Sequence, residues 1–143
     1  MSVLIVGAGF SGLGTAIRLL QNGIDDFVIL ERSDRVGGTW RDNTYPGAAC
    51  DIPSVLYSYS FAPNPDWSRA YSGGAEIQRY IEDLVQRYGL RERIRFGTEV
   101  TALQFDSDTG SWTADTAGGE VFTGRAVVLA AGRDLHVDAD DLA

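Results

Sequence analysis

The sequence has little of what several classes of protein require. It contains a single cysteine, Cys50, and a single histidine, His136. One cysteine allows no internal disulfide, no cysteine pair for a zinc site and no dithiol redox centre. The chain also lacks an apolar run of the roughly 18 residues that a membrane-spanning helix needs. We therefore expect a protein without a metal site or a membrane span, and a reducing cytoplasm suits its cysteine content.

Positive charge is also scarce. Twelve Lys and Arg residues face twenty Asp and Glu residues, which gives a net charge of −8. This balance argues against nucleic acid as a partner, because a phosphate-binding surface needs an excess of basic side chains. An acidic chain suits an anionic ligand that is held by backbone dipoles. The N-terminus lacks the basic segment of a signal peptide, and 143 residues correspond to about one domain.

The first thirty residues have the pattern of a βαβ unit. A short apolar run at Val3–Val6 predicts a strand buried on both faces, as in a parallel sheet. Leu13, Ala16, Ile17 and Leu20 then share one face of a helix over 11–21. A second buried strand is predicted at 27–30. The segment 32–72 that follows holds all four prolines and has no sustained periodicity, so we expect short turns that wrap a ligand or a second domain.

The second half of the chain predicts one long helix and several short strands. An apolar stripe of helical period indicates a helix over 74–88, before Gly89. The final apolar strand ends before Gly132, and the acidic tail 133–143 gives no clear signal. We expect an α/β fold: a Rossmann-like, glutathione-reductase-like domain whose parallel sheet is covered by helices, with a small antiparallel meander inserted before the last strand. The predicted strands are 94–96, the meander at 99–105, 111–116 and 120–123, and 126–131.

The turn between the first strand and helix has the sequence Gly7-Ala8-Gly9-Phe10-Ser11-Gly12. In a dinucleotide-binding turn the first glycine permits the tight turn, the second lets the backbone approach a pyrophosphate, and the third lets helix and strand pack closely. The helix N-terminus then presents N–H groups and a positive dipole end to the phosphates. This motif alone is weak evidence, because a glycine-rich turn can exist without a ligand.

Glu31 ends the second predicted strand, nineteen residues after Gly12. An acidic residue about 20 residues after the glycine turn commonly binds a ribose hydroxyl. A carboxylate accepts hydrogen bonds from a 2′-OH and repels a 2′-phosphate, so this position favours the adenosine of NAD or FAD. The alternative is a solvated surface glutamate, which the register of turn, helix and strand makes less attractive.

A second pair of glycines separates FAD from NAD. Gly37 and Gly38 follow Glu31 closely, where an ordinary NAD-binding unit would begin its next helix, and each would weaken that helix by about 1 kcal/mol. Paired glycines instead suggest a second approach of the backbone to a longer ligand such as FAD. Trp40 would pack near the flavin or anchor the loop.

Three segments together resemble the N-terminal FAD domain of class B flavoprotein monooxygenases, most closely the Baeyer–Villiger monooxygenases. They are GAGFSGLG, ERSDRVGGTW and YPGAACDIPS, and the resemblance runs from Val3 to about Gly132. The first is shared by many flavoproteins, whereas GGTW followed by Tyr45-Pro46-Gly47 is far more specific. So are Asp66-Trp67 and the Ala75-Glu76-Ile77 helix start.

The resemblance implies roles for individual residues. The first glycine turn would bind the pyrophosphate and Glu31 the adenosine ribose, while Asp51 would lie beside the flavin and the nicotinamide as the catalytic candidate. Ala130-Ala131-Gly132 stands where the family usually has Ala-Thr-Gly. Cys50 is interpreted as a packed residue, and His136 is given no catalytic role. The cofactor-binding candidates are Gly7, Gly9, Phe10, Ser11, Gly12, Glu31, Arg32, Gly38, Thr39, Trp40, Asp51, Tyr57, Val100, Ala131 and Gly132.

Members of this family use FAD, NADPH and O2 to convert a ketone to an ester or lactone. They also need a second dinucleotide-binding domain, an arginine near the flavin and a linker with a histidine, and these parts are expected to be absent here. The first hypothesis is therefore the N-terminal piece of a monooxygenase that acts on a ketone or another lipophilic substrate, completed by a missing C-terminal part or partner chain. The second is a stand-alone FAD- or nucleotide-binding module without catalysis. The third, a disulfide reductase or amine oxidase, fits the single cysteine and YPGAACD poorly.

Overall fold

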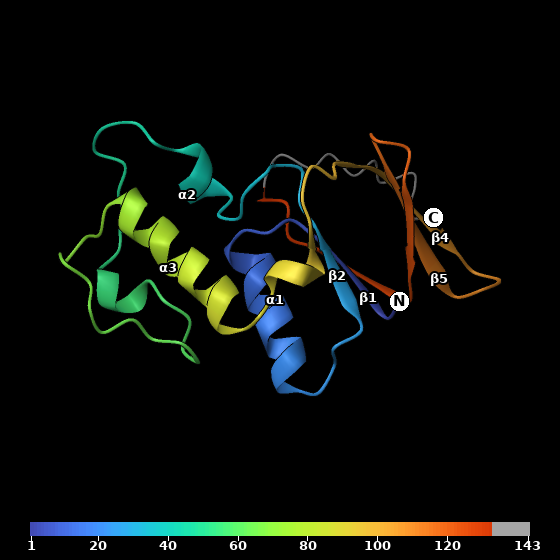
Figure 1. Cartoon of the computed structure of the whole chain (residues 1–143), viewed down its shortest axis with the longest axis horizontal. Coiled ribbons are helices and arrows are strands. Elements are labelled where there is room, and N and C mark those ends of the chain that lie inside the picture. The colour runs from blue at the N-terminus through green and yellow to red at the C-terminus, as the bar shows by residue number, and fades with distance from the viewer. Residues whose placement is uncertain (133–143) are drawn as a thin grey trace.

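The computed structural model describes residues 1–132 and shows an α/β domain built on a four-stranded parallel sheet (Figure 1). The strand order is β3-β2-β1-β7, and β1 pairs in parallel with both β2 and β7. The parallel strands are β1 (Val3–Val6), β2 (Phe27–Leu30), β3 (Ile94–Arg95) and β7 (Ala126–Leu129).

Helices cover one face of this sheet. Helix α1 (Phe10–Gln21) and helix α3 (Gly74–Arg87) pack there, and both lie on the same side of β1 and β2 in Figure 1. The apolar stripe of α3 that the sequence predicted is buried in this core through Ile77, Ile81 and Leu84. Side chains alternate between the two faces of a strand, so Ile5 of β1 points into the helical core.

The other face of the sheet is covered by strands. The antiparallel meander comprises β4 (Val100–Asp106), β5 (Ser111–Thr116) and β6 (Val121–Gly124). Leu103 and Ala114 of the meander form a second core with Leu4, Val28 and Leu30 of the parallel sheet. The expectation of a sheet covered by helices therefore holds for one face only. The meander is an insertion, as predicted, and it supplies the apolar layer that the second face needs.

The segment 32–72 contains more regular structure than its composition suggested. A one-turn helix, α2 (Thr39–Asp42), begins directly after Gly38, and a short 3₁₀ helix, η1 (Ser54–Leu56), lies further along. Outside this segment, a second 3₁₀ helix, η2 (Arg91–Arg93), precedes β3. The Tyr80 hydroxyl of α3 accepts a hydrogen bond from the Tyr59 N–H and donates one to the Ala62 carbonyl. The segment is thus held against α3 by polar and aromatic contacts.

The remaining differences from the sequence prediction are small. The last strand ends at Leu129, so Ala131 lies beyond it, and the strand at 94 has two residues. His136 and the tail 133–143 lie outside the described residues. Within residues 1–132, no helix combines the length and apolar character needed to cross a bilayer.

Candidate functional site

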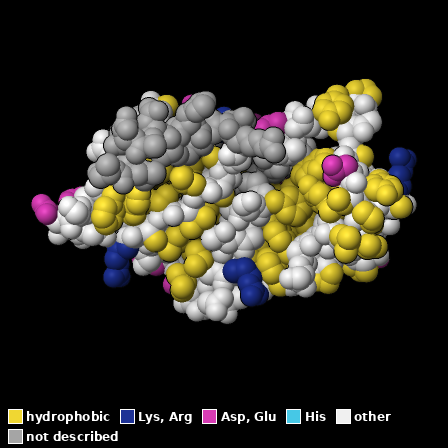
Figure 2. Space-filling model, turned by 180° about the vertical axis from the view of Figure 1, so that it is seen from behind, with side chains coloured by type: hydrophobic (Ala, Val, Ile, Leu, Met, Phe, Trp, Pro, Cys, Tyr) yellow, Lys and Arg dark blue, Asp and Glu magenta, His cyan; other side chains and the backbone are white. Residues whose placement is uncertain are grey.

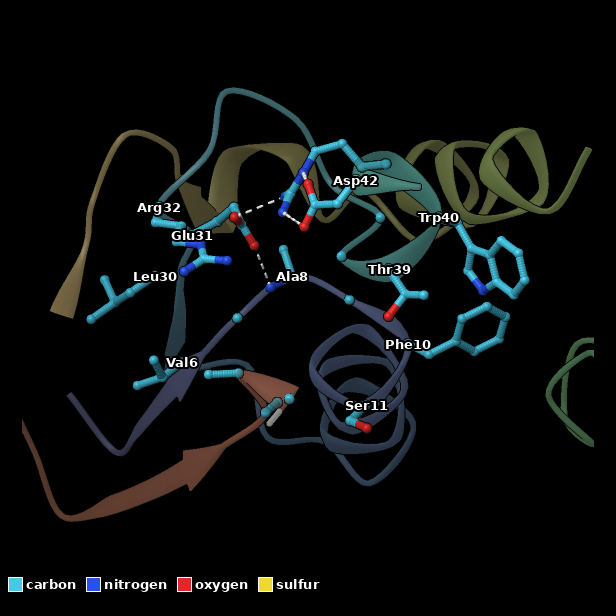
Figure 3. Close-up of a pocket in the computed structure, with 18 of the residues that line it drawn as sticks. Val6, Ala8, Phe10, Ser11, Leu30, Glu31, Arg32, Thr39, Trp40 and Asp42 are labelled. Carbon is cyan, nitrogen blue, oxygen red and sulfur yellow. Dashed lines mark hydrogen bonds and ion pairs between the residues drawn. The ribbon is translucent and has the colours of Figure 1, made fainter. Parts of the chain in front are cut away.

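A cavity of about 570 Å³ opens at the carboxyl ends of β1, β2 and β7. Ligands of open α/β sheets bind at this edge. Figure 3 shows Glu31 and Arg32 at one end of this pocket, and Phe10 and Trp40 at the other. The residues predicted from sequence that line it are Gly7, Gly9, Phe10, Ser11, Glu31, Arg32, Gly38, Thr39, Trp40, Tyr57, Val100, Ala131 and Gly132.

The first glycine turn is shaped by close backbone contacts. Gly7 has a φ of +103°, and a Cβ there would lie 2.6 Å from the Ala130 carbonyl oxygen. A Cβ on Gly12 would lie 1.9 Å from the Gly7 carbonyl oxygen. Gly12 does not line the cavity. Its place in the structure is the contact between α1 and the end of β1, the packing role that the third glycine was expected to have.

Helix α1 directs its N-terminus at the cavity. The helix begins at Phe10, its first turn contains no acidic residue, and no side chain in the described part of the chain caps it. Phe10 and Ser11 both line the cavity. The N–H groups and dipole of the first turn are therefore available to an anionic ligand.

The second glycine pair meets the first turn. The Gly37 N–H donates to the Ala8 carbonyl at 3.0 Å, and a Cβ on Gly38 would lie 3.3 Å from the Gly9 Cα. Both Gly37 and Gly38 have positive φ values, of +126° and +54°. The backbone of the second glycine pair thus lies against the first turn in the cavity wall, where Gly9 and Gly38 have no side chains to separate them.

Glu31 is 4% exposed and connects three parts of the cavity wall. One carboxylate oxygen, Oε2, accepts from the Ala8 N–H at 2.8 Å. The other, Oε1, accepts from the Ser33 N–H and from Arg41 Nη1, both at 2.9 Å. A solvated surface glutamate would have none of this burial, so that alternative is wrong.

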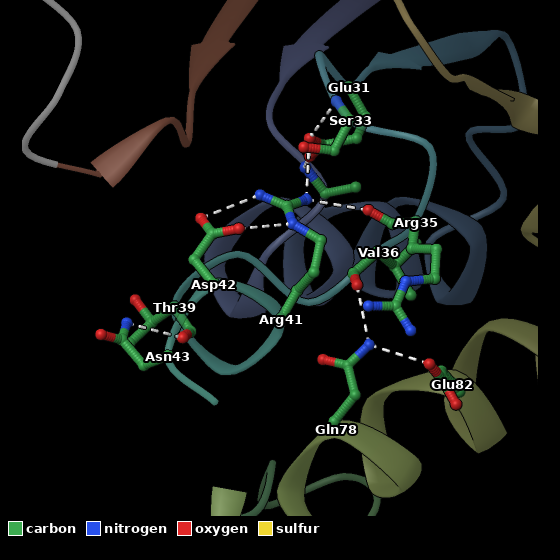
Figure 4. Close-up of polar contacts among 11 residues, drawn as sticks. Glu31, Ser33, Arg35, Val36, Thr39, Arg41, Asp42, Asn43, Gln78 and Glu82 are labelled. Atoms are coloured by element: carbon green, nitrogen blue, oxygen red, sulfur yellow. Dashed lines mark hydrogen bonds and ion pairs between the residues drawn. The ribbon is translucent and has the colours of Figure 1, made fainter. Parts of the chain in front are cut away.

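Arg41 is the principal residue of the site that the sequence analysis missed. Its guanidinium lies between Glu31 and Asp42 (Figure 4), with Nε 2.7 Å from the Asp42 carboxylate and Nη1 also 2.8 Å from the Arg35 carbonyl. The hydrogen bond from Arg41 lowers the pKa of Asp42, and the bond to Asp42 raises the pKa of Arg41. The sequence signal was only an Arg-Asp pair after Trp40, which does not reveal a partner ten residues earlier.

Aromatic side chains form the far end of the cavity. The Trp40 Nε1–H donates to the Tyr57 hydroxyl at 2.9 Å, and the two rings meet edge to face. Phe10 packs against Tyr57 with ring centroids 5.3 Å apart. Burial raises the pKa of Tyr57, so its hydroxyl stays protonated at neutral pH. A planar ligand would meet three rings at this end.

The structure does not place Asp51 in the cavity. Its side chain is exposed, and Asp51 is absent from the lining. The neighbouring Cys50 is buried, with its Sγ 3.9 Å from the Ser54 hydroxyl, as expected of a packed residue. Other lining residues that the sequence analysis did not single out include Asn43, Thr98 and Glu99. They come from loops whose approach to the cavity has no local sequence signature.

The chain is similar to known proteins over most of its length. The profile of the NAD(P)-binding Rossmann-like domain family matches residues 5–73. A Baeyer–Villiger monooxygenase of Streptomyces coelicolor is 51% identical over 130 residues, which cover 91% of this chain and 25% of the relative. A Baeyer–Villiger monooxygenase of Pseudomonas aeruginosa is 47% identical, with the same coverage.

Solved structures of monooxygenases are also similar to this chain. A steroid monooxygenase bound to NADP superposes with a TM-score of 0.87 at 40% sequence identity. The superposition covers 92% of this chain and 26% of the steroid monooxygenase chain. The open structure of a cyclohexanone monooxygenase has a TM-score of 0.86 at 36% identity, again over 92% and 26% of the two chains. The chain therefore spans about a quarter of the length of the relatives it matches.

Proposed function

We propose that this chain, which is homologous to the N-terminal region of Baeyer–Villiger monooxygenases, forms the FAD-binding part of an NADPH- and O2-dependent flavin monooxygenase. One observation carries the proposal. Two glycines without side chains, Gly9 and Gly38, meet in a cavity that has the buried carboxylate of Glu31 at one end and aromatic rings at the other. An extended molecule with a ribose, a diphosphate and a planar ring system matches this order of surfaces.

The features of the cavity fit FAD. Its volume of about 570 Å³ lies within the range of roughly 300–1,000 Å³ of small-molecule sites. An ionised carboxylate has about four acceptor positions, and the bonds given above to Glu31 use three of them. The fourth, on Oε2, remains for a ribose hydroxyl. An anionic ligand is compatible with this end of the cavity because the carboxylates of Glu31 and Asp42 lie beside two guanidinium groups, that of Arg41, which bonds to both, and that of Arg32, whose charge also lowers the pKa of Asp42.

Each end of the cofactor then has its own residues. We assign the pyrophosphate to the backbone of Gly7, Gly9 and Ser11 at the start of α1, and the ribose to Glu31. The adenine is assigned to the backbone of Val100, beside Ala131 and Gly132.

At the other end, Thr39, Trp40 and Tyr57 would orient the flavin ring. When bound, FAD would supply the redox chemistry with NADPH and O2, and the chain's residues would bind and orient it. Asp51 keeps its assignment as the candidate beside the flavin and the nicotinamide, on the strength of the sequence resemblance alone.

Substrate and partners follow from the relatives. Their names include cyclohexanone and steroid monooxygenases, so we assign a ketone or a similar lipophilic molecule as substrate. Hydrophobic side chains lie exposed over a broad part of the face in Figure 2. Val55 and Leu56 are 78% and 69% exposed, beside the partly exposed Ile52. Such surface suits contact with further parts of a larger enzyme. A reducing cytoplasm suits the single free Cys50.

A chimera tests the monooxygenase assignment. Residues 1–132 would replace the matching segment of the Streptomyces coelicolor relative, and NADPH oxidation and ester formation would be measured with a panel of cyclic ketones. We expect a yellow chimera that retains ketone turnover, whereas the 143-residue chain alone should oxidise no NADPH in response to ketone. The native relative, prepared in parallel, is the control.

Two outcomes would contradict the assignment. A folded chimera that holds FAD but has no turnover would favour an FAD-binding module without catalysis, for which the cavity contacts of this one chain would suffice. Ketone-dependent NADPH oxidation by the isolated chain would show that it needs no further domain.

A further inference from the structure

Arg41 has the contacts of a residue that organises the site rather than one that merely lines it. Its side chain is 8% exposed, and its hydrogen bonds reach Glu31, Asp42 and the Arg35 carbonyl. Arg41 belongs to α2, directly after the second glycine pair, while Glu31 directly follows β2. The ion pair therefore joins the loop that carries Gly38 to the parallel sheet.

Glu31 forms hydrogen bonds to several segments that surround the cavity. Beyond its side-chain bonds, the Glu31 N–H donates to the Arg95 carbonyl and its carbonyl accepts from the Thr98 N–H, both at 2.9 Å. Its carboxylate reaches Ala8 in the first glycine turn. The backbone of Glu31 is thus fixed by β3 and the turn after it, and the orientation of its carboxylate is set by Ala8, Ser33 and Arg41.

The bonds to the two carboxylate oxygens are unequal. Oε1 is saturated by the Ser33 N–H and Arg41, whereas Oε2 has one partner, the Ala8 N–H. Without Arg41, Oε1 would have a vacant acceptor position and the carboxylate would lose one of the three contacts that set its orientation, the only one of the three made by a side chain. A buried carboxylate without its cation is also strongly disfavoured. The geometry thus leaves one acceptor position, on the oxygen nearest the first glycine turn.

We infer that Arg41 is a positioning residue that sets the hydroxyl specificity of the nucleotide site: it holds the Glu31 carboxylate so that Oε2 accepts one ribose hydroxyl, and it fixes the second glycine loop against the first. This inference rests on the proposed FAD-binding function. Arginine suits the task because its planar fork bonds two carboxylates and a carbonyl at once, which a lysine ammonium cannot reproduce.

The test measures discrimination between nucleotides. Dissociation constants for ADP, 2′-deoxy-ADP and 3′-deoxy-ADP would be determined with the full 143-residue chain. The larger of the two losses in affinity is the hydroxyl penalty. For the wild type we expect a penalty of about tenfold or more, as befits a hydrogen bond to a charged group. In Arg41→Gln the penalty should fall to about threefold or less. A purely structural role would weaken ADP and its analogues equally and leave the penalty unchanged.

Two further variants complete the test. Arg79→Gln, an exposed position on α3 away from the cavity, makes the same change of charge and should keep the wild-type penalty. Arg41→Lys keeps the charge but not the fork, so its penalty should also fall, and it decides the matter if Arg41→Gln does not fold. A wild-type penalty in folded Arg41 variants would overturn this inference alone. Absence of nucleotide binding by the wild type would overturn the proposed function, and this inference with it.

Discussion

Gly12→Ala is expected to abolish FAD binding and to lower the melting temperature by about 10 °C. The added Cβ would lie 1.9 Å from the Gly7 carbonyl oxygen, so α1 would have to move away from the end of β1. The obstacle is backbone rather than a flexible side chain, so we expect about 3 kcal/mol or more, the upper end of overpacking costs. In a chain of this length each kcal/mol corresponds to about 3–5 °C. The measurements are thermal unfolding by circular dichroism and titration with FAD.

Gly118→Ala is the matched control. Gly118 has an ordinary φ, and a Cβ there meets no atom within 4 Å. This variant should unfold and bind FAD like the wild type. If Gly12→Ala bound FAD with wild-type affinity, α1 would not need to lie this close to β1, and the dinucleotide-binding interpretation of the turn would be wrong.

Glu31→Arg is expected to have a second large effect, on the fold as well as on the ligand. The new guanidinium would face Arg41 in a buried position, and the N–H groups of Ala8 and Ser33 would lose their acceptor. An uncompensated buried charge costs about 3–5 kcal/mol, and each unsatisfied N–H about 1–3 kcal/mol. The variant should be largely unfolded, or folded with FAD affinity reduced more than about 100-fold.

The milder Glu31→Gln separates the two effects. An amide keeps the shape of the side chain and one acceptor oxygen, so this variant should fold and bind FAD about tenfold more weakly. Glu120→Arg makes the same charge reversal at an exposed position and should change neither property. A Glu31→Arg protein with wild-type unfolding and FAD affinity would show that Glu31 neither organises the cavity nor binds the ribose.

Local patterns predicted the elements that surround the site. The apolar runs at Val3–Val6 and Phe27–Leu30 are buried on both faces, and the stripe on α3 is buried on one face. The hydrophobic pattern of each element therefore suffices to set its bounds, which are confirmed within about a residue. The glycine turn was predictable because its spacing meets a steric requirement of the backbone. In the structure a Cβ at Gly7 or Gly12 would clash with a backbone carbonyl oxygen.

The rest of the site depends on contacts between distant segments. Helix α2 is a single turn held by Arg41 against Glu31, and nothing within 32–42 alone indicates that pair. The meander covers the second face of the sheet through Leu103 and Ala114, and the alternation of side chains in a strand does not tell which layer will meet it. The catalytic assignment of Asp51 comes from the family resemblance alone, and its exposed side chain does not line the cavity.

The central claim is that the cavity at the carboxyl ends of β1, β2 and β7 binds FAD through the ADP half of the cofactor. Titration of the 143-residue chain with FAD, followed by flavin fluorescence, tests it most directly when ADP and FMN are then added as competitors. The account predicts saturable binding at one site, displacement by ADP and little effect of FMN, which lacks the adenosine that Glu31 and Val100 would contact. Absence of saturable binding, or displacement by FMN but not by ADP, would contradict it.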